Sequence, residues 1–417
     1  MKKHLKSLLR PSALFFALSF LFLVSCSAPA NPLLSSNPLP VSSSLSSGAS
    51  SSLSSSGSSS SNASSSSSGV SSSGSSIATA EGLEVYALEQ TGQYGDCTLF
   101  KKGNHEILID GGNRASAPQL AEALKAHVND HELDLLVLTH PHEDHYGGFT
   151  GGSTPASDGG TLVDGGITSL KAIVDCGALT SSSGYENSYV NGFRNYWIAH
   201  GALYQGIADV VAKDPYQAIT FIDSSLQIQW LDTGNYLPVG GDANGDANVY
   251  SIACNVRFGS YDFFLAGDLP SSPERDLVSI YRDHSFLKEG NHLIYKACHH
   301  GSNGANDASL LSFLKPEVAW VSAGIIAANC TSSGIVSPQH PFRDARSRIE
   351  QVTGRENMWW NGTAGTLTMN VSADSSSFSI AGAGRHYGDY YIDGKLVDRL
   401  EEKDLPLELT KWASAGF

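Results

Sequence analysis

Three histidines and two carboxylates stand within six residues, in the segment His140-Pro141-His142-Glu143-Asp144-His145. The segment follows the apolar run Leu135–Leu138, which predicts a buried strand. Its first two histidines are separated by one residue, so their rings point the same way on an extended chain, while Asp144 and His145 lie beyond a turn. Imidazole nitrogen and carboxylate oxygen are ligands for zinc and, less selectively, for manganese or iron. The spacing predicts two metals side by side; a histidine-rich surface loop is the alternative.

This segment resembles the His-x-His-x-Asp-His signature of the metallo-β-lactamase superfamily. Upstream, Leu108–Gly112 contains Asp110 and resembles the first-motif aspartate of that family, which follows a strand. Downstream, the predicted strand Tyr261–Ala266 runs into Gly-Asp at Asp268, where the family has a carboxylate that bridges both metals. The resemblance implies an α/β fold, a four-layer αββα sandwich of two mixed sheets flanked by helices.

A second histidine pair, His299 and His300, follows the predicted strand His292–Cys298 and matches the final histidine ligand of the family. Because neighbouring residues on a strand face opposite sides, we expect one of the pair to bind metal and the other to contact substrate or donate a proton. The sequence leaves this choice open.

The resemblance also implies a role for each motif residue. Asp110 is expected to accept a histidine N–H and so to fix the tautomer of a ligand. The expected ligands are His140 and His142 for the first metal, Asp144, His145 and one of His299 or His300 for the second, and Asp268 as the bridge. We therefore expect two divalent ions, zinc in the first instance and manganese as the alternative.

Further motifs are similar to the extracellular domain of ComEC-type DNA-uptake proteins. They are Gly92–Cys97, Lys296 followed by His-His-Gly-Ser, and Gln339-His340-Pro341. The similarity spans residues 83 to 372, and the membrane-channel part of that family is absent, so uptake is not implied. By this resemblance His340 protonates the leaving group, and it joins Asp144, His299 and His300 as an expected catalytic residue.

One family ligand is missing. Many relatives supply a third histidine to the first metal after the fourth strand, where this chain has Asp175 and Cys176. His200 is a weaker candidate, because Trp197 and its apolar neighbours predict a helix whose histidine is structural. Loss of this ligand is expected to weaken the first metal site.

The chain begins with a basic segment and an apolar stretch that is short for a membrane span, so residues 1–26 predict a secretion signal. Leu23–Cys26 resembles a lipoprotein processing box, which predicts a lipidated Cys26 and a mature protein held at the outer face of a bacterial membrane. An uncleaved anchor is the alternative and gives nearly the same location. Residues 27–80 are rich in serine and glycine and predict a disordered tether.

The folded part is expected to be one hydrolase domain, residues 81–385, with a C-terminal extension at 386–417. Strands and helices alternate through it, as in an α/β protein. The glycine-rich stretch Gly147–Gly166 predicts a mobile loop over the metals, and Ala178–Tyr216 predicts an inserted helical segment whose aromatic side chains form core. Asp242–Asn248 has alternating oxygen side chains, but it lacks the glycine and the glutamate of a calcium loop, so a solvated turn is favoured.

The chain carries 26 basic and 41 acidic residues, a formal net charge of -15, which disfavours a long nucleic-acid groove. Metal ions are the largest positive charges in such a site. Lys296 is interpreted either as a further phosphate contact or as a lysine on an edge strand.

We predict a surface-anchored metal-dependent hydrolase of phosphodiesters. Nucleic acid or nucleotide is the first substrate choice, and a phosphorylated wall polymer or its phosphocholine ester is the second. Lactones and thioesters on the same fold, or a non-catalytic binding protein with a vestigial site, are alternatives. No stable protein partner is expected.

Overall fold

The computed structural model describes residues 81–383, with gaps at 93, 178, 181, 215, 217, 244, 325–329, 332–333 and 336–339, and the short strands at 391–392 and 395–396. The predicted signal segment with Cys26 and the tether lie outside the described residues, as does most of the extension predicted at 386–417. Within the described part of the chain, no helix has the length and apolarity needed to cross a membrane.

The first sheet is mixed. Its strand order is β17-β16-β1-β2-β3-β4-β5-β6, antiparallel from β17 to β3 and parallel from β3 to β6. The strands are β1 (Leu83–Ala87), β2 (Thr98–Lys102), β3 (His105–Ile109), β4 (Glu132–Leu138), β5 (Ser169–Asp175), β6 (Leu203–Gly206), β16 (Leu367–Val371) and β17 (Phe378–Gly382).

The second sheet repeats this arrangement with the strand order β15-β12-β11-β10-β9-β8-β7, parallel from β15 to β10 and antiparallel from β10 to β7. Its strands are β7 (Ile219–Phe221), β8 (Leu226–Leu231), β9 (Ala253–Phe258), β10 (Tyr261–Leu265), β11 (His292–Lys296), β12 (Val318–Val321) and β15 (Met358–Trp360). Two small hairpins pair β13 (Cys330–Thr331) with β14 (Gly334–Ile335) and β18 (Tyr391–Ile392) with β19 (Lys395–Leu396).

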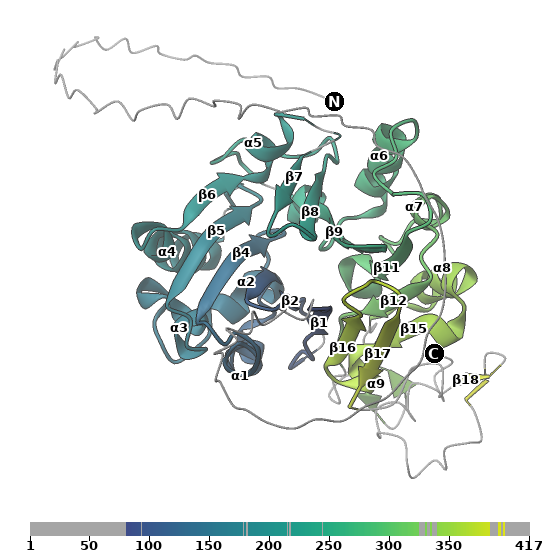
Figure 1. Cartoon of the computed structure of the whole chain (residues 1–417), viewed down its shortest axis with the longest axis horizontal. Helices are drawn as coiled ribbons and strands as arrows, with labels where there is room; N and C mark the ends of the chain where they lie inside the picture. Colours follow the sequence, from purple (N-terminus) through teal and green to yellow (C-terminus); the bar gives the residue numbers. More distant parts are fainter. Residues whose placement is uncertain are drawn as a thin grey trace, which may run out of the picture. The chain divides into compact units, whose positions relative to one another are not determined.

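Helices cover the outer face of each sheet (Figure 1). The first sheet carries α1 (Ala117–His127), α2 (Glu143–Thr150), α3 (Gly160–Asp164), the π-helix η3 (Tyr185–Arg194) and α4 (Asn195–Ala199). The second sheet carries α6 (Ser271–Tyr281), α7 (Ala308–Leu314) and α8 (Arg343–Thr353). Two short helices complete the described α-helices, α5 (Ile207–Val211) and α9 (Asn361–Ala364). The described 3-10 turns are η1 (Arg114–Ser116), η2 (Ala156–Asp158), η4 (Ala247–Tyr250), η5 (Cys298–Gly301) and η7 (Arg355–Asn357).

The main core lies between the two sheets. Val85 and Val137 of the first sheet and Trp230, Val256 and Phe263 of the second are fully buried in one apolar cluster. Each strand contributes alternate residues to this layer and the others to the helices outside, as expected for sheets covered on both faces. The predicted architecture of two mixed sheets flanked by helices is confirmed.

The glycine-rich stretch Gly147–Gly166 is partly helical, so the prediction of a loop over its whole length was wrong at its two ends, while residues 151–155 do form a loop. Helix α2 runs through Gly147 and Gly148, and α3 follows it. A Cβ atom on Gly148 would lie 1.8 Å from the backbone oxygen of Gly111. The backbone N–H of Gly148 also donates to the carbonyl oxygen of Gly112 at 2.7 Å. The glycines therefore allow α2 to pack closely against the loop after β3.

The inserted segment is only partly helical, because β6 lies within it. The aromatic side chains predicted to form core are buried against the first sheet at Tyr185, Tyr189, Phe193 and Trp197, and Tyr196 is partly buried against the same cluster.

This close packing predicts that Gly148→Ala destabilises the fold. Overpacking against the backbone of Gly111 is expected to lower the free energy of unfolding by about 1–3 kcal/mol, measured by urea denaturation. Gly304→Ala is the control, because a Cβ there meets only the Ser302 hydroxyl at 3.8 Å, and we expect a change within about 0.5 kcal/mol. Equal stabilities of the two variants would contradict this account of α2.

Candidate metal centre

The histidine motif and its partners lie where strands of both sheets end. Asp110 directly follows β3, and His140 comes two residues after the end of β4, which is parallel to β3. In the second sheet Asp268 follows β10, and His300 follows the parallel strand β11. Parallel strands end at the same edge of a sheet, so residues far apart in sequence meet there.

Four of the predicted ligands converge. One ligand atom from each of Asp144, His145, Asp268 and His300 lies within 4.8 Å of the others. The Nε2 atom of His300 is 3.1 Å from Asp144 Oδ2 and 3.3 Å from Asp268 Oδ2. The Nε2 atom of His145 is 3.3 Å from Asp268 Oδ1. These residues correspond to the set expected for the second metal.

Unpaired buried atoms in this group fit a divalent cation. His145 Nε2 and Asp268 Oδ1 are buried and have no hydrogen-bond partner, and the same holds for Nε2 of His140. Buried polar atoms are nearly always satisfied, so three unpartnered atoms on residues next to Asp268 or on Asp268 itself are consistent with a missing positively charged partner. His140 Nε2 is 3.9 Å from Asp268 Oδ2, and the His140 and His142 rings are adjacent, with centroids 4.7 Å apart.

The three residues considered for the missing ligand make their contacts outside the metal-ligand cluster. Asp175 is fully buried and accepts hydrogen bonds from Arg194 Nη1 and the Tyr204 hydroxyl, both at 2.9 Å. Cys176 is buried, with its sulfur 3.9 Å from the Tyr185 hydroxyl. His200 is exposed, with Nδ1 2.8 Å from a backbone oxygen of its own helix. None of the three belongs to a ligand group found in the described part of the chain. The second metal position is therefore better equipped than the first.

Asp110 lies where it can orient His145. Its Oδ2 atom accepts the Nδ1–H of His145 at 2.8 Å, and its oxygens also accept from the backbone N–H and the hydroxyl of Thr139, at 2.8 and 2.7 Å. Burial raises the pKa of Asp110, and the neighbouring His145 opposes that rise. The backbone of Asp110 is left-handed (φ 58°), a conformation that aspartate tolerates better than most residues. With Nδ1 engaged, Nε2 of His145 is left to face the cluster.

The second histidine pair lies in the turn η5, beyond the end of β11, so the expectation that the two rings alternate along a strand was wrong. Both residues have left-handed backbones, with φ values of 49° and 52°. His300 is buried and donates from Nδ1 to the carbonyl oxygen of Ser322 at 2.8 Å, which directs its Nε2 to the carboxylates. The side chain of His299 is 28% exposed, and its Nε2 is 3.5 Å from Asp268 Oδ2.

Two further charged residues of the centre were missed or misjudged from sequence. Asp96 is buried, has Oδ1 3.3 Å from His300 Nδ1, and forms an ion pair with Lys296. Lys296 also donates to the backbone oxygen of Gly267 at 3.1 Å and is 2% exposed. Because β11 is an interior strand, Lys296 is neither an edge-strand lysine nor a free phosphate contact. The sequence did contain an indication of this pair, because a lysine within a buried strand requires a buried carboxylate partner.

Charge interactions set the protonation of the cluster. Burial alone would lower the pKa of His145 and of His300, but Asp268 and the other nearby carboxylates raise both pKa values well above the usual range. Burial raises the pKa of Asp268, whereas His300 and His145 outweigh burial and hold that pKa well below its usual value. The charges of the two rings and of Asp268 therefore depend on one another, and a bound cation would compete with protons for both rings.

His340 borders the same cluster. Its ring centroid is 4.9 Å from that of Tyr94 and 5.9 Å from that of His299, and its buried Nδ1 has no hydrogen-bond partner. Burial, followed by His300 and His299, lowers the pKa of His340 to about 3. The ring is then neutral at pH 7, which is unfavourable for the predicted role of proton donor to a leaving group.

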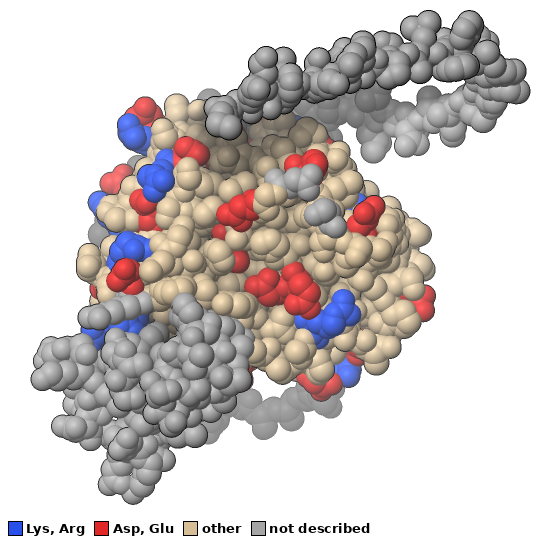
Figure 2. All heavy atoms as spheres, turned by 180° about the vertical axis from the view of Figure 1, so that it is seen from behind, with Lys and Arg blue, Asp and Glu red and all other residues tan. Residues whose placement is uncertain are grey.

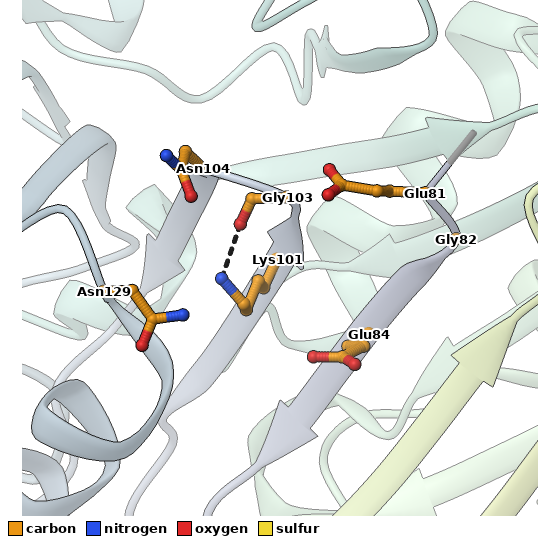
Figure 3. Close-up of a pocket in the computed structure, with 7 residues that line it drawn as sticks. All are labelled: Glu81, Gly82, Glu84, Lys101, Gly103, Asn104 and Asn129. Carbon is orange, nitrogen blue, oxygen red and sulfur yellow. Dashed lines mark hydrogen bonds between the residues drawn. The ribbon is translucent and has the colours of Figure 1, made fainter. Parts of the chain in front are cut away.

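A cavity of about 240 Å³ opens beside His142. It is lined by Pro141, His142, Glu143, Tyr146, Thr180, Ser182, Ala243, Gly245 and Ala247. A second cavity of about 320 Å³ lies near the start of β1 and is lined by Glu81, Glu84, Lys101 and their neighbours (Figure 3). No lining residue of the second cavity belongs to the histidine cluster.

Comparison with known proteins agrees with this centre. Residues 91–151, which contain the histidine motif and Asp110, match the model of the family described as the metallo-beta-lactamase superfamily. The match is confined to this part of the chain, and the two mixed sheets flanked by helices are consistent with the metallo-beta-lactamase fold. No curated protein sequence matches the chain.

Several solved structures are similar to the chain at low identity. The metallo-beta-lactamase fold protein YhfI from Bacillus subtilis is 13% identical, with a TM-score of 0.37, over 67% of this chain and 96% of that one. The short form of human tRNase Z is 12% identical, with a TM-score of 0.32, over 67% and 92%. A diphosphatase from the PhnP family is 14% identical, with a TM-score of 0.31, over 57% and 86%.

The geometry predicts that the two histidines of η5 differ in their effect on metal binding. His300→Ala is expected to weaken binding of the tightest metal by more than about 100-fold, because residues that only orient ligands already cost about 10- to 100-fold. His299→Ala should weaken binding of the same metal by less than about 10-fold, by comparison with the same range. Zinc titration by calorimetry, with elemental analysis of the dialysed proteins, measures both. A larger loss in His299→Ala would reverse the assignment.

Proposed function

We propose that this chain is a metal-dependent hydrolase that cleaves phosphodiesters. The observation that carries the proposal is the convergence of Asp144, His145, Asp268 and His300, with unpaired buried atoms, next to an open cavity at His142. Divalent metals at such a centre lower the pKa of a bound water to about 7 and polarise a phosphoryl or carbonyl oxygen. The fold family includes several reaction classes, so the site and not the fold must select the substrate.

The residues of the chain have distinct tasks in this reaction. Asp144, His145, Asp268 and His300 would hold the second metal, and His140 and His142 would contribute to the first, with Asp268 shared between them. Asp110 holds His145 in one orientation, and the carbonyl oxygen of Ser322 does the same for His300. These fixed orientations reduce the reorganisation needed as the substrate reacts.

A substrate with a single negative charge suits this centre. Lys296 is engaged with Asp96, so it adds no free positive charge at the entrance. The face in Figure 2 carries acidic side chains interspersed with a few basic ones, without a continuous basic stripe. Together with the net charge of -15, this favours a short phosphodiester over a long nucleic acid. Esters, lactones and thioesters are the competing substrates.

We also propose that the enzyme acts at the outer face of the cell membrane, tethered through Cys26 and residues 27–80. Support comes from the basic and apolar leader, the cysteine at its end and the serine-rich segment. A specific relationship to ComEC-type domains is likewise a proposal, supported by the motifs at 92–97, 296–302 and 339–341.

Loss of a ligand should abolish both metal and activity. We expect Asp268→Ala and His142→Ala to lower kcat for bis-p-nitrophenyl phosphate by more than about 100-fold, since even orienting residues cost about 10- to 100-fold, and to reduce metal per chain. Cys176→Ser should leave both unchanged. Full activity in Asp268→Ala would refute metal-assisted hydrolysis, and turnover of a lactone or thioester without turnover of any phosphodiester would move the proposal to that substrate class.

The low pKa of His340 predicts that its imidazolium is not the leaving-group acid. If it were, His340→Gln would slow an alkyl phosphodiester far more than a p-nitrophenyl ester, whose leaving group needs no proton. We expect instead that the two substrates lose kcat/KM by the same factor within about threefold, or about 0.7 kcal/mol. A selective loss with the alkyl ester would restore the proton-donor role.

A further inference from the structure

We infer that the cavity beside His142 binds the substituent that remains on the phosphorus, and that Glu143 makes the cavity prefer a cationic substituent over an anionic one. This inference rests on the proposed function and names its substrate class, a short phosphodiester with an amine or quaternary ammonium group. His142 links the cavity to the candidate metal centre, because it belongs to the metal motif and also lines the cavity.

Three segments form the walls of the cavity. The start of α2 supplies His142, Glu143 and Tyr146. The segment after β5 supplies Thr180 and Ser182. The loop before η4 adds Ala243 and Gly245, and the first residue of η4 adds Ala247. The cavity adjoins the first metal position, so a group bound in it stays close to the reacting phosphorus.

Glu143 gives the cavity a negative charge. It is a half-exposed carboxylate, and its Oε1 accepts the backbone N–H of Arg114 at 2.9 Å. The guanidinium of Arg114 lies with Nε 3.9 Å from the same oxygen, but its Nη1 and Nη2 donate to Thr150. Arg114 is not among the described lining residues, and neither is any lysine or other arginine. A second phosphate in this cavity would meet Glu143 without a cationic side chain in the lining to offset the repulsion.

The remaining walls suit a small polar group. Thr180, Ser182 and Tyr146 contribute hydroxyl groups, and Tyr146 is held by Tyr185, with ring centroids 5.4 Å apart. The volume of about 240 Å³ is below the roughly 300 to 1,000 Å³ of cavities that enclose drug-sized ligands. A head group of a few heavy atoms fits this space better than a nucleotide with its neighbouring phosphates.

The test compares three esters that release the same p-nitrophenol from the metal-loaded full-length protein. They are p-nitrophenyl phosphorylcholine, the p-nitrophenyl ester of thymidylate, and that thymidylate ester with an additional phosphate on the sugar. The first is cationic at the substituent, the second neutral and the third anionic. We expect kcat/KM to fall in this order, by about fivefold or more at each step, the effect of about 1 kcal/mol.

Variants of Glu143 distinguish the effect of its charge on substrate preference from the effect of the other cavity residues. Glu143→Gln should reduce the preference for the choline ester over the phosphorylated ester by about fivefold or more, and Glu143→Lys should invert the order. Glu122→Gln is the matched control, because Glu122 is exposed on α1 and pairs with Lys125. Metal content of each variant shows that the fold and the centre persist.

The outcomes separate the inference from the function. Turnover of all three esters, with no preference in the wild type or with the same preference in Glu143→Gln, overturns the role of Glu143 and leaves the phosphodiesterase intact. Preference for the phosphorylated ester overturns the substrate class. No metal-dependent turnover of any ester refutes the proposed function and this inference with it.

Discussion

Burial of carboxylates beside imidazoles is the constraint on which this centre depends. Asp96, Asp110 and Asp268 are each less than 5% exposed. An ionised carboxylate removed from water is very unfavourable unless it is paired. Lys296 pairs with Asp96, and His145 pairs with Asp110. Asp268 faces His145 and His300, whose Nε2 atoms are candidate ligand atoms. A divalent cation would take over this pairing, because it would offset the charge of Asp268 in place of the protons on the two histidines.

The fold meets this constraint by assembling the centre from both sheets at one edge. Gly147 and Gly148 within α2 let the helix approach the loop that carries Asp110. Left-handed backbones at Asp110, His299 and His300 turn the chain sharply where the strands end. Such conformations cost about 1–3 kcal/mol each, and they persist only where surrounding contacts enforce them. Their concentration beside the ligand atoms indicates that the stability of the sandwich is used to hold the centre in one geometry.

The two metal positions are unequal, and the inequality bears on substrate binding. The second position has four converging residues, whereas the first relies on His140, His142 and the shared Asp268. The strand end where the resemblance predicts a further histidine is occupied by the ion pair of Asp175 and Arg194. The cavity with Glu143 lies on the side of His142, so the weaker position is also the one next to the proposed substituent pocket. The proposed substituent pocket therefore adjoins the candidate metal position that has fewer converging ligands.

The sequence by itself determined the fold class, the residue types of the centre and most of the strands. Apolar runs with a period of two predict strands whatever surrounds them, and imidazole and carboxylate groups at the end of such a run have few uses besides binding a cation. The sequence also placed Asp175 and Cys176 where the resemblance predicts a further histidine, although it could not give the contacts that these two side chains make.

Only the tertiary structure decided which partner each side chain has. Lys296 meets Asp96 across 200 residues of chain, and His300 meets Asp144 across 156. The choice of His300 over His299 depends on backbone torsions in a turn that local pattern did not reveal. The cavity beside His142 exists because three separate segments surround it. Local periodicity encodes which face of an element is buried, whereas charge pairing between distant strand ends depends on how the two sheets are placed against each other.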